Sequence, residues 1–168
     1  MRYLLTSLVV LAIVGTATAA HAQSQKRPAK HATHEHTAPA GVFDHKTVEE
    51  AWKVAIEKKK PLLVMFTSNN CTFCRKMIAD TYSNEEVKDL LRGRTESVMA
   101  HSDHYASLIK KLGIRGYPSS LLISPEGEVL DFMEGYVDAQ EFAKRVGPLL
   151  DRPATQLGMN VNKQTVEH

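Results

Sequence analysis

The chain of 168 residues has only two cysteines, one tryptophan and 7% aromatic residues. With so few aromatic side chains, a platform for stacking nucleic-acid bases is not expected. The formal net charge of +2 is too close to balance to favour nucleic acid or an anionic membrane surface as a partner. We therefore expect no nucleic-acid partner. The remaining composition, 43% hydrophobic and 24% charged, is ordinary for a globular protein with one main domain.

Long hydrophobic runs are also scarce. The one strongly apolar run, residues 3–14, is well short of the roughly 20 residues that span a bilayer. It follows Arg2 and precedes small and hydroxylated residues, and residues 20–22 read Ala-His-Ala. This three-part order is typical of a secretory signal peptide, here residues 1–22 with cleavage after Ala22. We expect a periplasmic or secreted protein that has no membrane span once the signal is removed.

Polar segments flank the predicted domain, which we place at residues 41–151. Residues 23–40 lack hydrophobic periodicity and predict a flexible arm, and residues 152–168 predict a frayed polar tail. The arm carries the histidines His31, His34 and His36. Such a tract can bind Cu(II), Ni(II) or Zn(II) weakly. We favour a polar arm without metal, because flexible ligands lose entropy on binding.

Helix and strand signals alternate along the domain. Thr47 and Ser83 each precede a glutamate by three positions, the capping-box pattern of a helix start. The unbroken apolar run at residues 62–66 predicts a strand buried on both faces. In chain order we predict a helix ending near Lys60, a strand at 62–66, helices at 74–78 and 83–93, a strand at 96–100, a helix at 105–112, strands at 120–123 and 128–133, and a helix at 138–150.

The order of these elements predicts the fold class. Strand–helix–strand units imply parallel strands, and the last two strands, joined by a short turn, form an antiparallel hairpin. We therefore predict an α/β fold in which a central mixed sheet of four to five strands has helices on both faces.

The two cysteines, Cys71 and Cys74, lie where the buried strand gives way to a helix. One helical turn brings residues i and i+3 onto the same face, so the two sulfurs can form a disulfide. A loop this short stabilises a fold by only about 2 kcal/mol, which is little for a structural staple. Cys71, at the start of the helix, is the expected nucleophile, because unpaired N–H groups favour a thiolate there. Cys74 is the expected resolving thiol.

Together with the run Gly113-Ile114-Arg115-Gly116-Tyr117-Pro118, the Cys-x-x-Cys motif resembles the thioredoxin superfamily, and most closely its exported branch. The resemblance covers residues 61–150 and implies a thioredoxin-like fold and protein-disulfide oxidoreductase activity without a cofactor. It implies that Pro118 is a cis proline facing the cysteine pair and that the backbone of Tyr117 pairs with extended substrate. The side chains expected to contact substrate are those of Thr72, Phe73 and Tyr117. The implied partners are exported proteins with thiols or disulfides, and a redox partner.

Three positions depart from the family pattern. Asn70 stands where the family often has tryptophan, and Thr72-Phe73 replaces the usual Gly-Pro. Met65 stands where thioredoxins carry a buried aspartate that accepts a proton from the second cysteine. Reductase, oxidase and isomerase roles therefore remain open.

Two other functions compete with disulfide exchange. A copper-handling protein would use the cysteine pair together with the histidine-rich arm, and a redox-inert module would only bind partners. The intact cysteine pair argues against the second. A zinc site lacks a second cysteine pair. We expect His101 and His104, the remaining candidate ligands near a predicted strand end, to be ordinary solvated residues.

Overall fold

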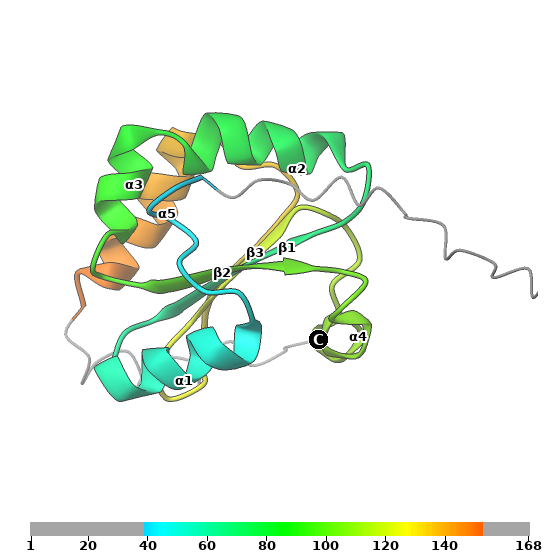
Figure 1. Cartoon of the computed structure of the whole chain (residues 1–168). Coiled ribbons are helices and arrows are strands. Elements are labelled where there is room, and N and C mark those ends of the chain that lie inside the picture. The colour runs from blue at the N-terminus through cyan, green and yellow to red at the C-terminus, as the bar shows by residue number, and fades with distance from the viewer. Residues whose placement is uncertain (1–38, 153–168) are drawn as a thin grey trace, which may run out of the picture. The chain divides into compact units, whose positions relative to one another are not determined.

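The computed structural model describes residues 39–152, and the predicted signal peptide lies outside this range. The described chain has the predicted α/β architecture, with four strands in the order β2-β1-β3-β4 and helices on both faces of the sheet (Figure 1). The elements are α1 (Val48–Lys58), β1 (Leu62–Thr67), α2 (Thr72–Met77), the π-helical turn η1 (Ile78–Tyr82), α3 (Glu85–Leu91), β2 (Glu96–His101), α4 (Ala106–Leu112), β3 (Ser119–Ile123), β4 (Val129–Glu134) and α5 (Ala139–Leu150).

The central strand β1 determines the mixed character of the sheet. It pairs in parallel with β2, from Leu62 opposite Glu96 to Thr67 opposite His101. On its other side it pairs antiparallel with β3, and β3 pairs antiparallel with β4 as the predicted hairpin. Every residue of β1 is buried, as its apolar run predicts, because helices cover both faces of a strand that has neighbours on both sides.

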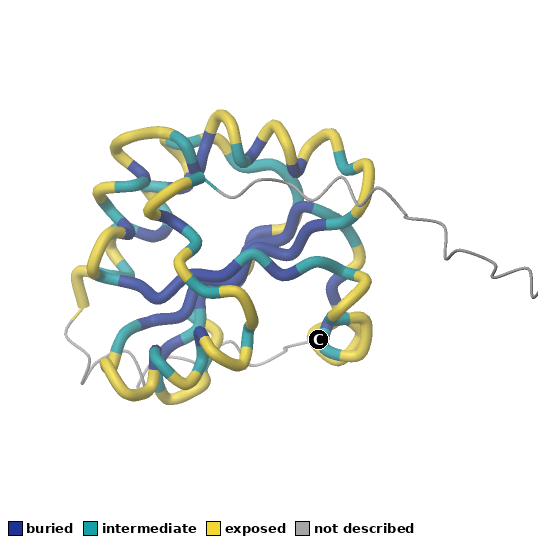
Figure 2. The backbone as a smooth tube through the Cα atoms, in the orientation of Figure 1, coloured by how far each residue is buried: buried dark blue, intermediate teal, exposed yellow. Residues whose placement is uncertain are grey.

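Two apolar layers sandwich the sheet. Leu63 and Met65 of β1 point toward the layer that contains α2, α3 and α5, and Val64 and Phe66 point toward the layer that contains α1 and α4. Alternate residues of a strand face opposite sides, so β1 contributes to both cores. Figure 2 shows this central strip of buried backbone between largely exposed outer helix faces.

The capping prediction for α1 is confirmed. Thr47 Oγ1 accepts a hydrogen bond from Glu50 N (3.1 Å), and Pro61 follows the helix before β1 begins. The predicted helix at 74–78 is longer than expected. It begins at Thr72 and runs through η1 to Tyr82.

The predicted start of α3 is wrong by one residue. Asn84, not Ser83, caps the helix, and its Oδ1 accepts hydrogen bonds from Glu86 N (2.9 Å) and Val87 N (3.4 Å). Ser83 instead ends the preceding turn, since its Oγ donates to the Ile78 carbonyl (2.7 Å). The π-helical turn adds a residue to that end, which shifts the cap along the chain.

Within residues 39–152, none of the helices combines the length and apolar character needed to cross a membrane.

Candidate active site

Cys71 and Cys74 form a disulfide, with an S–S distance of 2.00 Å and their Cα atoms 5.2 Å apart. β1 ends at Thr67, a three-residue loop follows, and Cys71 is the N-cap of α2. Cys74 is fully buried (0% exposed), whereas Cys71 is partly exposed. The two sulfurs, which are joined by one bond, therefore differ in their access to solvent.

A backbone N–H points at the outer sulfur. Cys74 N donates a hydrogen bond to Cys71 Sγ (3.1 Å), because the N-cap position places a side chain against the free N–H groups of the first turn. In the reduced protein the same donor would stabilise a thiolate at Cys71. The buried sulfur of Cys74 has no corresponding cap contact.

The residues beside Cys71 form an open rim. Phe73 is 60% exposed and Thr72 is exposed, with its Oγ1 accepting from Arg75 Nη2 (3.2 Å). Asn70 adopts a left-handed backbone (φ 57°), which asparagine tolerates better than most residues. Asn69 Nδ2 donates to Asp103 Oδ2 (2.8 Å) and so ties this loop to the segment after β2.

A second loop lies at the same end of the sheet. The Tyr117–Pro118 peptide bond is cis, as the resemblance implies. Ser119 pairs with Phe66, so Pro118 lies level with the end of β1 that leads to Cys71. Two hydrogen bonds fix the loop, from Gly135 N to the Pro118 carbonyl (2.8 Å) and from Ser119 Oγ to the Gly116 carbonyl (2.9 Å).

The ring of Tyr117 does not stand free in solvent. It packs partly against both apolar layers, and its residue is of intermediate exposure. Of the two rings expected beside the sulfurs, Phe73 alone is largely exposed.

Comparison with known proteins agrees with this geometry. Residues 48–147, more than half of the chain, match the family described as the thioredoxin-like domain. The chain belongs to the thioredoxin-like domain family. No curated protein matches its sequence.

Solved structures share the fold of this thioredoxin-like domain. A DsbH oxidoreductase has a TM-score of 0.58 and 19% identity, covering 70% of this chain and 92% of that chain. A candidate disulphide-isomerase from Bacteroides thetaiotaomicron has a TM-score of 0.57 and 27% identity, covering 66% and 93%. A thioredoxin from Thermus thermophilus has a TM-score of 0.57 and 23% identity, covering 61% and 83%.

The interior behind Cys74 is where this thioredoxin-like domain departs from the family pattern. Met65 is fully buried and belongs to the same apolar cluster as Cys74, Met77 and Tyr82. One buried polar pair in this layer is Tyr82 Oη with Ser120 Oγ (2.7 Å), and Ser120 is the strand partner of Met65. Burial raises the pKa of the Tyr82 hydroxyl, so this group stays protonated. A thioether and hydroxyls thus lie where the family pattern has a buried carboxylate.

The expectation that His101 is an ordinary solvated residue is wrong. Its side chain is only 17% exposed, and its Nε2 is a buried atom with no hydrogen-bond partner among the residues described. The reason is that β2 continues one residue beyond the predicted end and includes His101. His104 is exposed. Both imidazoles line a cavity of about 530 Å³ together with Lys46, Thr47, Met99, Asp103 and Tyr105.

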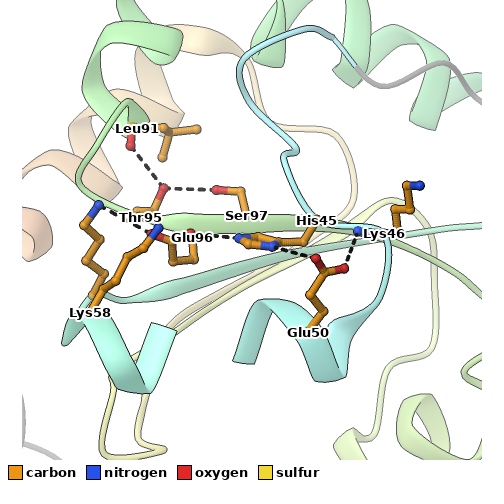
Figure 3. Close-up of polar contacts among 9 residues, drawn as sticks. His45, Lys46, Glu50, Lys58, Leu91, Thr95, Glu96 and Ser97 are labelled. Carbon is orange, nitrogen blue, oxygen red and sulfur yellow. Dashed lines mark hydrogen bonds and ion pairs between the residues drawn. The ribbon is translucent and has the colours of Figure 1, made fainter. Parts of the chain in front are cut away.

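The opposite end of β2 carries a polar cluster that the sequence pattern does not indicate (Figure 3). The Glu96 side chain is 7% exposed and lies 2.8 Å from His45 Nε2, 3.1 Å from Lys58 Nζ and 3.4 Å from Lys60 Nζ. Burial on its own raises the pKa of this carboxyl. The hydrogen bonds with His45 and the two lysines outweigh burial and hold the pKa below its usual value.

A metal site is not evident in the described part of the chain. No group of three or more histidine, cysteine or acidic side chains is placed to hold an ion there. The candidate ligands His31, His34 and His36 lie outside the described residues, so metal binding by the arm stays a prediction.

Proposed function

We propose that this protein exchanges disulfides with exported proteins, with Cys71 as the attacking nucleophile and Cys74 as the resolving thiol. The observation that carries the proposal is the inequality of the two disulfide-bonded sulfurs. Cys71 is partly exposed and accepts a hydrogen bond from Cys74 N, whereas Cys74 is fully buried. A substrate sulfur can approach the first, and only the chain's own interior surrounds the second.

The exchange proceeds in two balanced steps when the enzyme acts as a reductant. The Cys71 thiolate attacks one sulfur of a substrate disulfide, and the other substrate sulfur leaves as a thiolate and takes up a proton. Cys74 then loses its proton and attacks Cys71 Sγ, which forms the intramolecular disulfide and releases the second substrate sulfur. In the oxidising direction the same steps run in reverse.

Two features of the rim suit an extended polypeptide substrate. The exposed Phe73 ring offers apolar surface beside the sulfurs, and the backbone at Tyr117 lies at the same end of the sheet. A segment that pairs with this backbone would gain main-chain hydrogen bonds without requiring one particular sequence. We therefore propose unfolded or extended exported proteins as substrates.

Export is part of the proposal and depends on the signal pattern of residues 1–22. Expression of the full chain in an exporting bacterium should give a periplasmic protein whose first residue is Gln23. Peptide mapping by mass spectrometry reads the new amino terminus. Retention of residues 1–22 on the cell-associated protein would contradict export in this form.

The test of activity is reduction of insulin disulfides by dithiothreitol, together with oxidation of a reduced, unfolded protein. We expect the mature protein to accelerate at least one of these reactions, and Cys71→Ser to lose the acceleration while remaining folded. If the folded protein, with both thiols titratable, accelerates neither reaction, the proposal fails and a redox-inert binding module takes its place.

The direction of exchange depends on the reduction potential of the Cys71–Cys74 couple, measured in glutathione buffers. A value near that of thioredoxin, about −270 mV, would favour a reductase, and a value near −120 mV would favour an oxidase.

A further inference from the structure

An apolar cavity of about 500 Å³ lies on the face of the sheet that α1 and α4 cover, the lower face in Figure 1. We call it the α1–α4 cavity. Its floor is the sheet, with Val64 of β1 and both Leu121 and Ile123 of β3. Trp52 of α1 and Leu112 of α4 form part of its walls. The proposed disulfide exchange uses none of these residues.

The lining of the α1–α4 cavity favours an apolar occupant. Among the described residues that line it, only Glu49 and Lys111 are charged, one of each sign. Their charges cancel, so neither an anionic nor a cationic ligand is selected. A cavity of this size with a mostly apolar wall suits hydrophobic side chains.

The apolar surface continues from the cavity onto β4. Phe132 is the strand partner of Leu121, and Val129 is the strand partner of Ile123. Directly opposed residues of neighbouring strands have their side chains on the same face. Phe132 is 37% exposed, Val129 46% and Leu112 38%. Three of the five large hydrophobic side chains that are exposed in the described chain therefore lie at this cavity, and such a contiguous patch marks an interaction site.

The occupant lies on this face and does not extend the sheet, because the outer edge of β4 is already engaged. Phe132 N donates a hydrogen bond to Asp131 Oδ1 (2.9 Å), and the Phe132 carbonyl accepts one from Arg145 Nη2 (3.1 Å). Asp131 and Arg145 also form an ion pair with each other. A second copy of the chain that added a strand at β4 would have to break these contacts.

A segment beyond the described residues has the pattern that such a surface needs. Residues 153–168 follow α5, and as a whole they are predicted to form a frayed polar tail. Within this tail, Leu157, Met159 and Val161 alternate with glycine and asparagine, and no residue from 153 to 162 is charged. Strict alternation is typical of an extended segment with one apolar face, which requires an apolar surface to cover it.

The tail leaves the domain within reach of the cavity. Asp151 Oδ1 lies 2.5 Å from Arg94 Nη2, so α5 ends beside the start of β2. The cavity extends to the same end of the sheet, because the first residue of β1, Leu62, lines it. The five residues from Arg152 to Leu157 can span up to about 17 Å, more than the roughly 10 Å between packed layers.

We propose that residues 157–161 lie extended across the α1–α4 cavity, with Leu157, Met159 and Val161 against its apolar surface. Burial of these side chains drives the docking. The link to α5 holds the tail at an effective concentration on the order of 1 mM, so modest contacts suffice. The cavity is on the opposite face of the sheet from the Cys74 cluster, and the inference is therefore independent of the proposed function.

The chain carries its own reporter of this contact. Trp52 is the only tryptophan in the sequence, it is half-buried, and it lines the cavity. Its ring reaches the turn between β3 and β4, where a Cβ added to Gly127 would lie 3.9 Å from Trp52 Cη2. Tryptophan fluorescence of the mature protein therefore measures whether the cavity is covered.

We expect Met159→Asp to shift Trp52 emission to longer wavelength, because a charged side chain does not enter the cavity and the indole becomes exposed to water. Asn160→Asp adds the same charge to the other face of the extended segment and should leave the emission unchanged. In protein labelled at the methionine methyl groups, the Met159 methyl should give a nuclear Overhauser effect to the Trp52 ring. Met159→Asp removes this signal, and Asn160→Asp should preserve it.

A second pair of variants tests the cavity side. Leu112→Asp should give the same emission shift as Met159→Asp and should also abolish the Met159–Trp52 signal. Ile56→Asp is the matched control, since Ile56 is exposed on α1 and is not part of the cavity lining. If Leu112→Asp fails to fold, Met159→Asp alone decides, because it alters no residue of the folded domain.

Three results would overturn the proposal. The first is the absence of a Met159–Trp52 signal in the folded wild-type protein. The second is an equal emission shift in Met159→Asp and Asn160→Asp, which would reflect added charge alone. The third is a dimer in sedimentation that Leu112→Asp dissociates and Met159→Asp does not, which would assign the cavity to a second copy of the chain.

Discussion

The buried polar groups at the two ends of the β1–β2 pair differ in whether they have hydrogen-bond partners. At the amino end the Glu96 carboxylate is surrounded by His45, Lys58 and Lys60 (Figure 3). At the carboxyl end the Thr67 hydroxyl and the His101 Nε2 have no partner in the described chain, and the Cys71–Cys74 disulfide lies just beyond. The same two strands thus hold one polar cluster that is satisfied and one that is not.

This difference separates a stabilising region from a reactive one. A satisfied cluster holds its members in one charge state and ties elements together, here the segment before α1, the end of α1 and the start of β2. The Thr67 hydroxyl and His101 Nε2 make no such ties between elements, and they lie at the strand end that leads to the loop carrying the disulfide. Stability and exchange should therefore respond to substitutions at opposite ends of these strands.

The largest expected effect on stability is at the amino end. Glu96→Ala leaves His45 and the lysines without their common partner and should lower the free energy of unfolding by about 3 kcal/mol. Disulfide exchange by the protein that remains folded should be unchanged. Urea unfolding followed by circular dichroism measures the loss. The control Glu50→Gln removes an exposed carboxylate near the same histidine and should cost under about 0.5 kcal/mol. Equal losses of unfolding free energy in both variants would show that the buried carboxylate contributes no more to stability than the exposed one.

The second prediction concerns the stability of the protein at acidic pH. The folded-state pKa of Glu96 is held below its usual value of 4.5, so its contribution to stability is complete above that pH and is lost as the pH falls through the folded-state pKa. Unfolding free energies measured from pH 7 downward should decline more steeply for the wild type than for Glu96→Gln, which has no carboxyl to titrate. Parallel pH profiles for the two proteins would contradict this.

Most of the fold could be predicted from local sequence patterns. The apolar run of β1, the Thr47 cap, the turn before β4 and the Asp138 start of α5 each specify a structure within a few residues. The error at Ser83 has a physical cause, since both Ser83 and Asn84 are good helix caps and the π-helical turn decides between them. A sequence pattern of period 3.6 does not reveal such a turn.

The cysteine pair could also be predicted, because three-residue spacing is a local feature. The polar clusters could not, because they depend on strand register. Glu96 meets His45 across 51 positions of the chain, and Thr67 meets His101 through a parallel pairing that no turn specifies. In the sequence His101 begins a polar stretch that resembles solvated loop, and only its pairing with Thr67 of β1 makes it part of β2.

A third prediction sharpens the contrast at the carboxyl end. Thr67→Val replaces an unpartnered buried hydroxyl with a methyl group of similar size, so unfolding should become harder by up to about 1 kcal/mol. A loss of stability in thermal or urea unfolding would show that the hydroxyl has a partner after all.

The smallest expected effect is at the rim. Phe73 is largely exposed, so Phe73→Ala should leave stability unchanged and raise KM for an unfolded protein substrate about fivefold, equivalent to about 1 kcal/mol of contact. Reduction of a small aromatic disulfide should change much less. Val129→Ala, at an exposed apolar site on β4, is the control. Equal effects on large and small substrates would show that the ring supports the sulfurs and does not bind polypeptide.

The inequality of the two sulfurs is tested most directly by trapping covalent intermediates in an exporting host. Cys74→Ser removes the thiol that resolves the mixed disulfide, so complexes of this variant with exported proteins should accumulate through Cys71. They should run as discrete bands on non-reducing gels and disappear on reduction. Cys71→Ser should give almost no such bands, because the remaining sulfur is buried. Equal trapping by both variants, or trapping through Cys74 alone, would contradict the assignment of Cys71 as the nucleophile.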